Sequence, residues 1–457
     1  MGKYSLAKKN GRMTETHDKG LDKEKNKRNE TGVSITSRST PSHSREKGKT
    51  IENVLVLQGG GSLGAFGCGV FKAIAKRNIK IDIVAGTSIG AVNAAIIAGG
   101  RDGESPEQLL EQFWMELSDS FVDLNNTVAA FLPYLSIPAL AEQEMDYLLS
   151  YYPSYFLRGS NVQGEEHHQS ASANKKTKIK QLRSFYSSAI FGNPKMFKPR
   201  WKPEYAISDP EYFTPEKWTY LYDHSPLART LDKYVDYKKL NPNGKPNARL
   251  IISATNVLTA EPLVFDSSKQ QITPKHILGA SGYPSYNFPW VEVEKGIYAW
   301  DGSLLSNTPL REAIDASPVN DKQIFLVENY PKKIDVLPKD LPEVHHRARD
   351  IMFSDKTEHN VAMSKVITRY LQYIEELYQI VEQHANHAKL GEEQLKRIRH
   401  KYKKYKQERG AEIKQIFHIS RDEPFPHIYE NADFSPETIK NSIEEGEMKT
   451  NQALRKM

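Results

Sequence analysis

The regular apolar pattern begins after residue 53 and predicts two strand–turn–helix units in succession. Residues 54–57 (VLVL) form a continuous apolar run of strand length, which is typical of a strand buried on both faces. The run ends at three glycines, and apolar residues then recur at helical spacing over 65–77. A second short strand is predicted over 81–85, followed after a tight turn by a helix of small residues over 91–98. The rest of the chain is organised around this segment.

Regular structure returns at intervals further along the chain. We expect an amphipathic helix over 105–117, a buried strand over 249–255 and a helix over 273–280. Another strand ends at Tyr298-Ala299-Trp300, and a further one covers 323–328. With 457 residues and 38% apolar content, the chain has room for one large domain with a sizeable core.

Between about 120 and 230 the pattern changes to aromatic- and proline-rich pieces around a polar stretch over 161–180. One interpretation is a cap inserted into the domain, with an aromatic-lined groove for an acyl chain. The other is a small subdomain that the aromatic residues merely pack. The sequence leaves both open, and we expect a catalytic domain over 51–330 that contains this insertion.

The segment 331–457 predicts a helical extension. Apolar residues recur every three or four positions from Ile367 to Val381, Gly391 interrupts the pattern, and a second stripe follows. We expect a helical hairpin laid on the domain. Its second arm is strongly basic, which would suit the headgroups of an anionic membrane, although a solvated helix face is the simpler account. The basic residues of this arm are Lys396, Arg397, Arg399, Lys401, Lys403, Lys404 and Lys406.

The net charge of +6 comes from residues 1–50, which hold 13 Lys or Arg against six Asp or Glu. This segment has hardly any apolar residues and no periodicity, so we expect a disordered basic tail without the apolar core of a signal peptide. Elsewhere the charges balance, and nucleic-acid binding is excluded because it would need a second basic surface and a recognisable motif. The single cysteine, Cys68, rules out an internal disulfide, and no stretch reaches the roughly 20 apolar residues of a membrane span. We therefore expect a cytoplasmic protein that is at most peripheral to a membrane.

Two serines occupy a G-x-S-x-G frame, and their positions relative to the strands distinguish them. Ser62 lies within the glycine loop, whereas Ser88 lies on the turn between the second strand and its helix. A nucleophile elbow requires such a turn, since flanking glycines (here Gly86 and Gly90) let the chain pass closely and expose the hydroxyl. The helix behind Ser88 also directs its positive end at a developing oxyanion. We assign Ser88 as the candidate nucleophile; the alternative is a helix N-cap in a glycine-bounded turn.

The glycine loop permits two interpretations. Gly59, Gly61 and Gly64 spell G-x-G-x-x-G, the fingerprint of a dinucleotide-binding fold. That fold expects an acidic residue at the end of the second strand, but the nearby acid, Asp82, lies at the beginning of the strand. The loop is better suited to an oxyanion hole, in which backbone N–H groups face the ligand. A nucleotide-binding oxidoreductase is the rival enzyme hypothesis.

Asp301 is the candidate base. It follows an aromatic strand end and precedes Gly302, so its carboxylate can face a cleft. A carboxylate can accept the proton of a serine if partial burial raises its pKa. The alternative is an ordinary Asp-Gly turn, the commonest role of that dipeptide.

Taken together, the motifs resemble those of the patatin-like phospholipase family over about residues 53–330. Members of that family have a G-G-G-x-[RK]-G loop, a G-x-S-x-G elbow and a D-G-[GA] motif, which residues 59–64, 86–90 and 301–303 match in the same order. Leu63 and Ser303 differ from the usual residues of these motifs. Residues 280–289 and 306–309 also resemble the family. Residues 341–357 and 434–454 resemble an uncharacterised extension found in one bacterial group of patatin-like proteins.

The resemblance implies an α/β protein with a three-layer α/β/α fold, a mainly parallel central sheet, the inserted cap and the helical C-terminal extension. It also implies a catalytic dyad, in which Ser88 attacks an ester carbonyl and Asp301 takes its proton. The N–H groups of Gly60, Gly61 and Ile89 would hold the oxyanion. Lipid acyl esters are the implied substrates, and neither a metal nor an organic cofactor is required.

Two alternatives to the dyad stay open. A Ser-His-Asp esterase would need a downstream histidine, His345 or His346, to reach Ser88. An inactive patatin-like scaffold would act instead through its cap and helical extension, as an interaction protein.

Overall fold

The computed structural model describes residues 50–120, 187–339, 341–354, 357–385, 391–409, 411–422 and 430–456. The prediction of a disordered tail over 1–50, and most of the predicted cap, lie outside the described residues.

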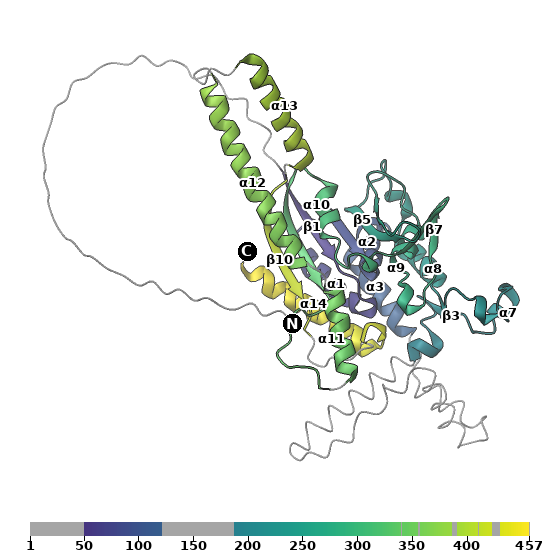
Figure 1. Cartoon of the computed structure of the whole chain (residues 1–457). Coiled ribbons are helices and arrows are strands. Elements are labelled where there is room, and N and C mark those ends of the chain that lie inside the picture. The colour runs from purple at the N-terminus through teal and green to yellow at the C-terminus, as the bar shows by residue number, and fades with distance from the viewer. Residues whose placement is uncertain are drawn as a thin grey trace, which may run out of the picture. The chain divides into compact units, whose positions relative to one another are not determined.

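A mainly parallel sheet forms the centre of the molecule (Figure 1), as the sequence predicted. Its strands lie in the order β10-β9-β1-β2-β5-β8-β7, with β6 paired to β5. The pairs from β10 to β5 are parallel, and those of β5 with β6, β5 with β8 and β7 with β8 are antiparallel. The strands are β1 (Ile51–Leu57), β2 (Ile83–Thr87), β5 (Arg249–Asn256), β6 (Pro262–Asp266), β7 (Val291–Glu294), β8 (Ile297–Asp301), β9 (Asp321–Glu328) and β10 (Ile413–Ser420).

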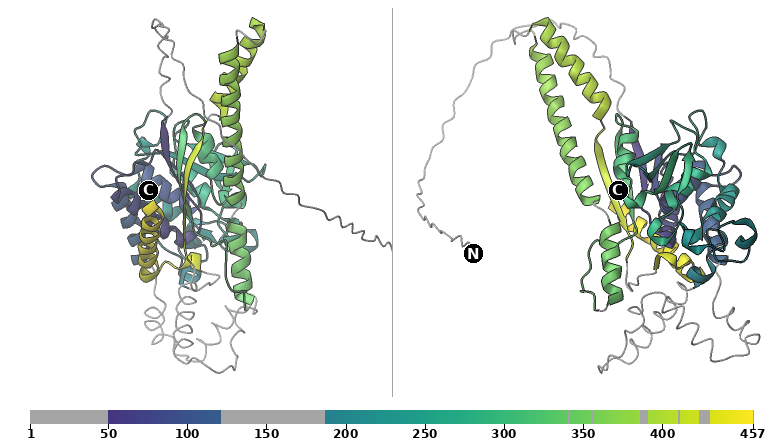
Figure 2. Two further views of the ribbon diagram at one scale, coloured as in Figure 1. Left: turned by 90° about the vertical axis from the view of Figure 1, so that its left-hand side faces the viewer. Right: turned by 45° about the vertical axis from the view of Figure 1, so that its right-hand side comes forward.

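Helices cover both faces of the sheet. Alternate side chains of a strand point to opposite faces, so Leu55 and Leu57 pack with Phe66 in one core, while Val54 and Val56 lie in the other. The first core lies under α1 (Gly64–Lys76), α2 (Ile89–Gly99), α3 (Pro106–Asp119), α8 (Ser225–Tyr234), α9 (Pro274–Ser281) and α14 (Pro436–Ala453). The second core lies under α10 (Leu310–Ala316) and α12 (Thr357–His384). The left view of Figure 2 shows the sheet between these helices, which is the three-layer α/β/α arrangement.

The second strand differs from its prediction in a way that matters for Ser88. The apolar run predicted a strand over 81–85, but β2 ends two residues later, because Gly86 and Thr87 still pair with Ile252 and Ser253 of β5. Ser88 therefore follows the strand directly, and α2 begins at the next residue.

The chain after residue 330 is mainly helical, and it also contributes a strand to the sheet. The two predicted helical arms are present as α12 and α13 (Glu392–Arg409), and the rings of Tyr378 and Tyr402 stack between them at 3.7 Å. Strand β10 pairs in parallel with β9 at the edge of the sheet. Pattern analysis missed this strand because apolar and polar residues do not alternate regularly along its sequence, IKQIFHIS. The predicted boundary at residue 330 stays a prediction.

The other described elements are short, apart from one helix that borders the candidate site. These are α11 (Leu341–Phe353), α7 (Tyr205–Ser208), and the two-stranded ribbon of β3 (Lys198–Pro199) and β4 (Tyr222–Asp223). No described helix is long and apolar enough to cross a membrane.

Helices α1 and α14 approach each other through glycines. A Cβ atom on Gly446 would lie 2.2 Å from the carbonyl oxygen of Phe66, and one on Gly69 would lie 1.9 Å from that of Ile443. Backbone cannot yield as a flexible side chain does, so the two helices would have to separate.

We expect Gly446→Ala to lower the free energy of unfolding by about 1–3 kcal/mol, because the added methyl group overpacks this contact. Urea unfolding followed by circular dichroism measures the change. Gly391→Ala is the matched control, since nothing lies within 4 Å of its Cβ position; equal stability of the two variants would contradict close packing at Gly446.

Candidate active site

Ser88 lies on a strained turn between β2 and α2. Its φ of 55° and ψ of −129° are rare for a residue with a side chain. A Cβ atom on Gly86 would lie 2.1 Å from the carbonyl oxygen of Gly90, and one on Gly90 would lie 2.3 Å from that of Leu57. The turn can therefore be this tight only with glycine at both positions.

Asp301 is the last residue of β8, and its side chain is completely buried. Its Oδ1 accepts a hydrogen bond of 2.8 Å from the Ser303 N–H. Burial raises the pKa of Asp301 to about 6 from its ordinary 3.8, and the nearby hydroxyl of Ser88 acts to lower it. Its Oδ2 receives no hydrogen bond of ordinary geometry from any described residue. One buried carboxylate oxygen close to Ser88 is thus available to a proton donor.

The C-terminal end of α9 holds the backbones of both residues. The Ser88 N–H donates to the carbonyl oxygen of Ala280 at 3.1 Å, and the Asp301 N–H donates to that of Gly282 at 3.2 Å. Although Ser88 and Asp301 are far apart in the sequence, these two bonds fix them to positions two residues apart on the same segment.

The glycine loop lies directly against Ser88. A Cβ atom on Gly59 would lie 2.9 Å from the Cβ of Ser88, and one on Gly64 would lie 2.7 Å from the Cγ1 of Ile89. Gly60 and Gly61 have φ values of 155° and 59°, which residues with side chains rarely adopt. The N–H groups of Gly60 and Gly61 donate to no described residue. Backbone donors beside a serine hydroxyl are the arrangement that an oxyanion requires.

Gln58 anchors the start of this loop, and pattern analysis did not single it out. Its buried amide nitrogen donates to Thr308 Oγ1 at 3.0 Å and to the Phe353 carbonyl at 3.1 Å. Its amide oxygen accepts the N–H groups of Asn329 at 2.7 Å and Tyr330 at 3.2 Å. The only signal in the sequence is a polar residue between an apolar strand and a glycine run.

Two asparagines complete the support of the loop. Asn329 Nδ2 donates to the carbonyls of Gln58 and Gly59, both at 3.0 Å. The carbonyl of Asn307 accepts the Gly59 N–H at 3.2 Å, and its side-chain Nδ2 donates to Phe353 at 2.9 Å. These side chains come from segments far apart in the sequence, so short-range patterns do not reveal them.

Ser88, Asp301, Gly60 and Gly61 line one cavity of about 490 Å³. Most of its lining is apolar or aromatic, which suits a hydrocarbon chain better than a polar substrate. The described part of the predicted cap supplies Phe197 and Tyr222, which also belong to the main core. The acyl groove predicted for its aromatic residues stays a prediction. The remaining apolar lining includes Ile89, Met196, Leu227, Phe288, Met352, Phe353 and Phe434.

The histidines considered for a triad do not line this cavity. His345 is exposed, and His346 lines a second, larger cavity, where its Nε2 lies 3.1 Å from Asp350 Oδ2. The histidine that does line the Ser88 cavity is His224, which the sequence interpretation missed. Its Nε2–H donates to the Leu278 carbonyl at 3.0 Å, and burial lowers its pKa. Its other ring nitrogen, Nδ1, has no hydrogen-bond partner among the described residues, so His224 makes no hydrogen bond to Ser88.

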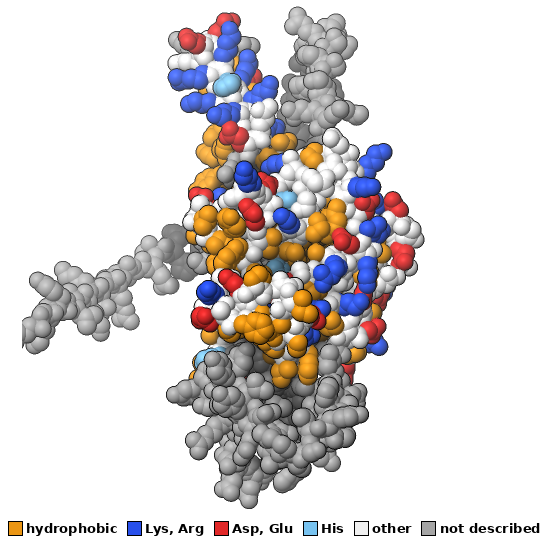
Figure 3. Space-filling view, turned by 90° about the vertical axis from the view of Figure 1, so that its right-hand side faces the viewer, with side chains coloured by type: hydrophobic (Ala, Val, Ile, Leu, Met, Phe, Trp, Pro, Cys, Tyr) orange, Lys and Arg blue, Asp and Glu red, His pale blue; other side chains and the backbone are white. Residues whose placement is uncertain are grey.

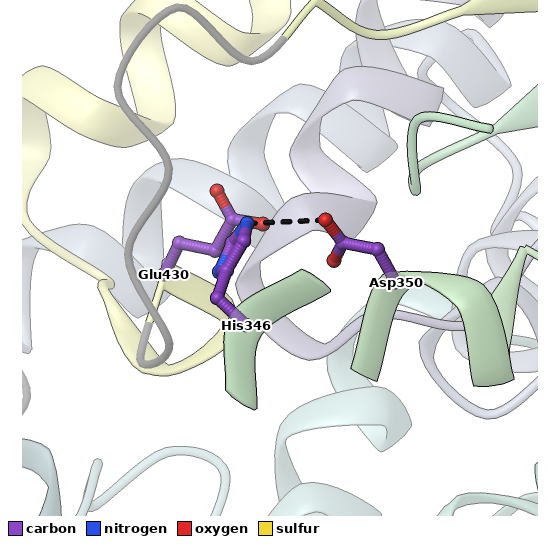
Figure 4. Close-up of side chains that lie close together, drawn as sticks. All are labelled: His346, Asp350 and Glu430. Carbon is purple, nitrogen blue, oxygen red and sulfur yellow. Dashed lines mark ion pairs between the residues drawn. The ribbon is translucent and has the colours of Figure 1, made fainter. Parts of the chain in front are cut away.

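His346, Asp350 and Glu430 form a buried cluster whose ligand atoms lie within 4.8 Å of one another (Figure 4). Two arginines occupy its carboxylates: Arg349 Nη2 lies 2.8 Å from an oxygen of Asp350 and of Glu430, and Arg421 Nη2 lies 2.8 Å from Glu430. Since these cations already balance both negative charges, the cluster is suited to joining α11 to the C-terminal segment rather than to binding a metal ion.

Asp82 does not lie where a dinucleotide-binding site would need it. Its Oδ2 accepts the N–H of Asn53, near the start of β1, at 2.9 Å. The glycine loop follows the opposite end of β1, and the two strands run in parallel. Asp82 and the loop therefore lie at opposite ends of these strands, so the structure does not support the oxidoreductase hypothesis.

Comparison with known proteins agrees with this geometry. The family model for patatin-like phospholipase matches residues 55–314. The chain belongs to the patatin-like phospholipase family. The match includes the glycine loop, the Ser88 turn and Asp301, the three segments that meet in the cavity.

Individual relatives cover less of the chain or differ more. A 48-residue stretch is 52% identical to lysophospholipase nte1 of Aspergillus terreus, which is 10% of this chain and 3% of that protein. VipD of Legionella pneumophila is 16% identical with a TM-score of 0.35, over 89% of this chain and 67% of VipD. ExoU of the Pseudomonas aeruginosa type III secretion system, in complex with SpcU, is 17% identical with a TM-score of 0.21, over 65% and 48% of the respective chains.

We expect Asp301→Asn to stabilise the folded protein at pH 8. A pKa raised from 3.8 to about 6 means that ionising this buried carboxyl costs about 3 kcal/mol. The variant lacks this cost above pH 7, and its advantage falls as the pH drops through 6 and vanishes below about 4, where the wild-type carboxyl is protonated. Urea unfolding of both proteins at pH 4 and pH 8 measures the difference; an advantage that does not depend on pH would contradict the raised pKa.

Proposed function

We propose that this protein is a serine hydrolase of lipid acyl esters that uses a Ser88–Asp301 dyad. The observation that carries the proposal is the pairing itself: a serine on a strained turn and a buried carboxylate of raised pKa lie close together in one apolar cavity. Family membership supports the reaction class, since the matched family is named for phospholipase activity.

The proposed reaction begins with Ser88 Oγ attacking the ester carbonyl while Asp301 Oδ2 accepts its proton. A base with a pKa of about 6 is ionised at neutral pH and still attracts a proton more strongly than an ordinary aspartate. Asp301 then returns the proton to the leaving alcohol, and the acyl-enzyme remains. Asp301 next takes a proton from a water molecule as the water oxygen attacks the acyl carbonyl. The bond between the acyl carbon and Ser88 Oγ then breaks, the fatty acid leaves, and Asp301 returns the proton to Ser88 Oγ.

The negative oxygen of each tetrahedral intermediate would lie at the glycine loop. The N–H groups of Gly60 and Gly61 have no acceptor among the described residues and border the same cavity. The N-terminus of α2, at Ile89, adds its positive dipole on the other side of Ser88. Pre-oriented donors of this kind stabilise the transition state more than the ground state.

The apolar lining of the cavity supports a long acyl chain as the part of the substrate that it binds. We propose that such lipids are met at an anionic membrane, to which the protein binds peripherally. The basic arm supports this, since its Lys and Arg residues gather over α13 at the top of Figure 3. An inactive scaffold is the competing hypothesis, and absence of hydrolysis by the wild type would favour it.

We expect Ser88→Ala and Asp301→Asn each to lower kcat/KM for a long-chain ester by at least about 10³-fold, because each removes a group that reacts. His346→Gln and His224→Gln are expected to stay within about tenfold of wild type, since neither histidine is placed to take the serine proton. Release of fatty acid from a monoacyl ester in detergent measures all four. Loss of activity in a histidine variant that retains its fold would instead indicate a triad.

The rate should also depend on pH through Asp301. We expect kcat/KM to rise with pH, about tenfold per unit well below pH 6, and to level off above about 7 as the carboxyl ionises. Ser303→Ala should move the midpoint to higher pH, because the Ser303 hydroxyl acts to lower the pKa of Asp301. Ser306→Ala is the control, a neighbouring hydroxyl with no such effect on Asp301; a wild-type profile without a midpoint near pH 6 would contradict Asp301 as the base.

A further inference from the structure

Helix α12 carries an apolar face that the described residues leave uncovered. Its members follow the spacing i, i+3, i+4, i+7, so they share one side of the helix. Tyr370, Tyr373 and Ile380 are 63%, 59% and 53% exposed, which is unusual for large apolar side chains in a row. The whole face, called here the α12 face, consists of Met363, Val366, Ile367, Tyr370, Tyr373, Leu377 and Ile380.

The α12 face is distinct from the sides of the helix that pack within the protein. Val361 belongs to the core beneath the sheet, and Tyr378 stacks on Tyr402 of α13. Leu371 is also buried. Leu371 and Tyr378 each follow a member of the face by one residue, which turns them about 100° round the helix. Among the described residues, the helix is therefore held on these sides and uncovered on the α12 face.

The neighbouring helix supplies positive charge. Side by side with α12 in Figure 2, α13 holds eight basic and three acidic residues over Glu392–Arg409. Arg399 and Lys406 pair with Glu382 and Glu375 of α12, which fastens the two helices together. Four exposed cations of α13 make no ion pair with a described residue: Lys396, Arg397, Lys401 and Lys403.

We infer that the α12 face inserts into the interface of an anionic lipid bilayer, with the cations of α13 on the headgroups. An apolar stripe next to a basic surface is the composition that binds such an interface. A second copy of the chain is the less suitable occupant, because its own α13 would bring the same positive charge. This surface is the one through which the enzyme proposed above would reach its lipids. Membrane binding by the α12 face does not require hydrolase activity; only the biological reason for the binding rests on the proposed function.

Binding to vesicles tests the inference without catalysis. The probe is the full chain with Ser88→Ala, sedimented with vesicles of phosphatidylcholine alone or with about 30% phosphatidylserine. We expect clear binding to the second kind and little to the first, and loss of binding at about 1 M salt, where charges are screened. Replacing Lys396, Arg397, Lys401 and Lys403 by Gln should abolish the preference for phosphatidylserine.

A matched pair of substitutions tests the α12 face itself. Leu377→Glu should lower the vesicle partition coefficient at least about tenfold. It removes an apolar group that would be buried in the bilayer, and it adds a negative charge that the anionic lipids repel. Gln379→Glu makes the same change in charge at an exposed position of α12 that does not share the spacing of the face, and it should stay within about twofold of the parent. Circular dichroism confirms that both variants fold.

Equal binding by Leu377→Glu and Gln379→Glu would overturn the inference. A dimer in sedimentation that Leu377→Glu converts to monomer, with no vesicle binding by either protein, would overturn it in favour of self-association. Hydrolysis of a soluble short-chain ester, measured with Ser88 restored, separates this question from the proposed function. Hydrolysis of the soluble ester should survive Leu377→Glu. If the protein with Ser88 binds vesicles but does not hydrolyse the ester, the result contradicts the proposed function and leaves the membrane inference standing.

Discussion

The arrangement of this site depends on one constraint: the carboxylate of Asp301 is held away from water beside Ser88. Removing a carboxyl from water raises its pKa, and the Ser303 N–H and the nearby hydroxyls only partly offset this. An ionised group in such a place costs stability, so the surrounding structure has to hold it there. The backbone bonds from Ser88 to Ala280 and from Asp301 to Gly282 do so, because they fix both residues to one segment. Stability is thereby given up at the position where a base is needed.

The conformational freedom of the glycine loop is a second difficulty. Side chains from distant segments of the chain restrict it. Gly59, Gly60 and Gly61 can bring N–H groups close to Ser88 because they have no side chains, but for the same reason they cannot fix their own conformation. Gln58 and two asparagines hold the backbone on one side. On the other, Ser62 Oγ donates to the Glu430 carbonyl at 2.8 Å, and a Cβ atom on Gly61 would lie 2.2 Å from that of Asn431.

The C-terminal chain is therefore part of the candidate site. The family match ends at residue 314, yet the Phe353 carbonyl accepts a hydrogen bond from Gln58, at the start of the glycine loop, and the Glu430 carbonyl accepts one from Ser62, within it. The ion-pair cluster of Arg349 with Asp350 and Glu430 joins the two segments that carry these carbonyls. Strand β10 and helix α14 add their own packing to the sheet and to α1. The same segments that support the loop also border the cavity, through Met352, Phe353 and Phe434.

The sequence by itself determined the elements whose signals are local. Apolar runs and helical spacing located β1, α1 and α2, and glycines at fixed offsets marked the Ser88 turn and the loop, because these features depend on neighbours within a few residues. Only the tertiary structure decided which distant groups meet: that Asp301 is wholly buried beside Ser88, that Gln58 bonds Phe353, that His224 rather than His346 borders the cavity, and that IKQIFHIS joins the sheet as β10. Burial and pairing between segments hundreds of residues apart depend on how the layers pack, and no local pattern of residues records that.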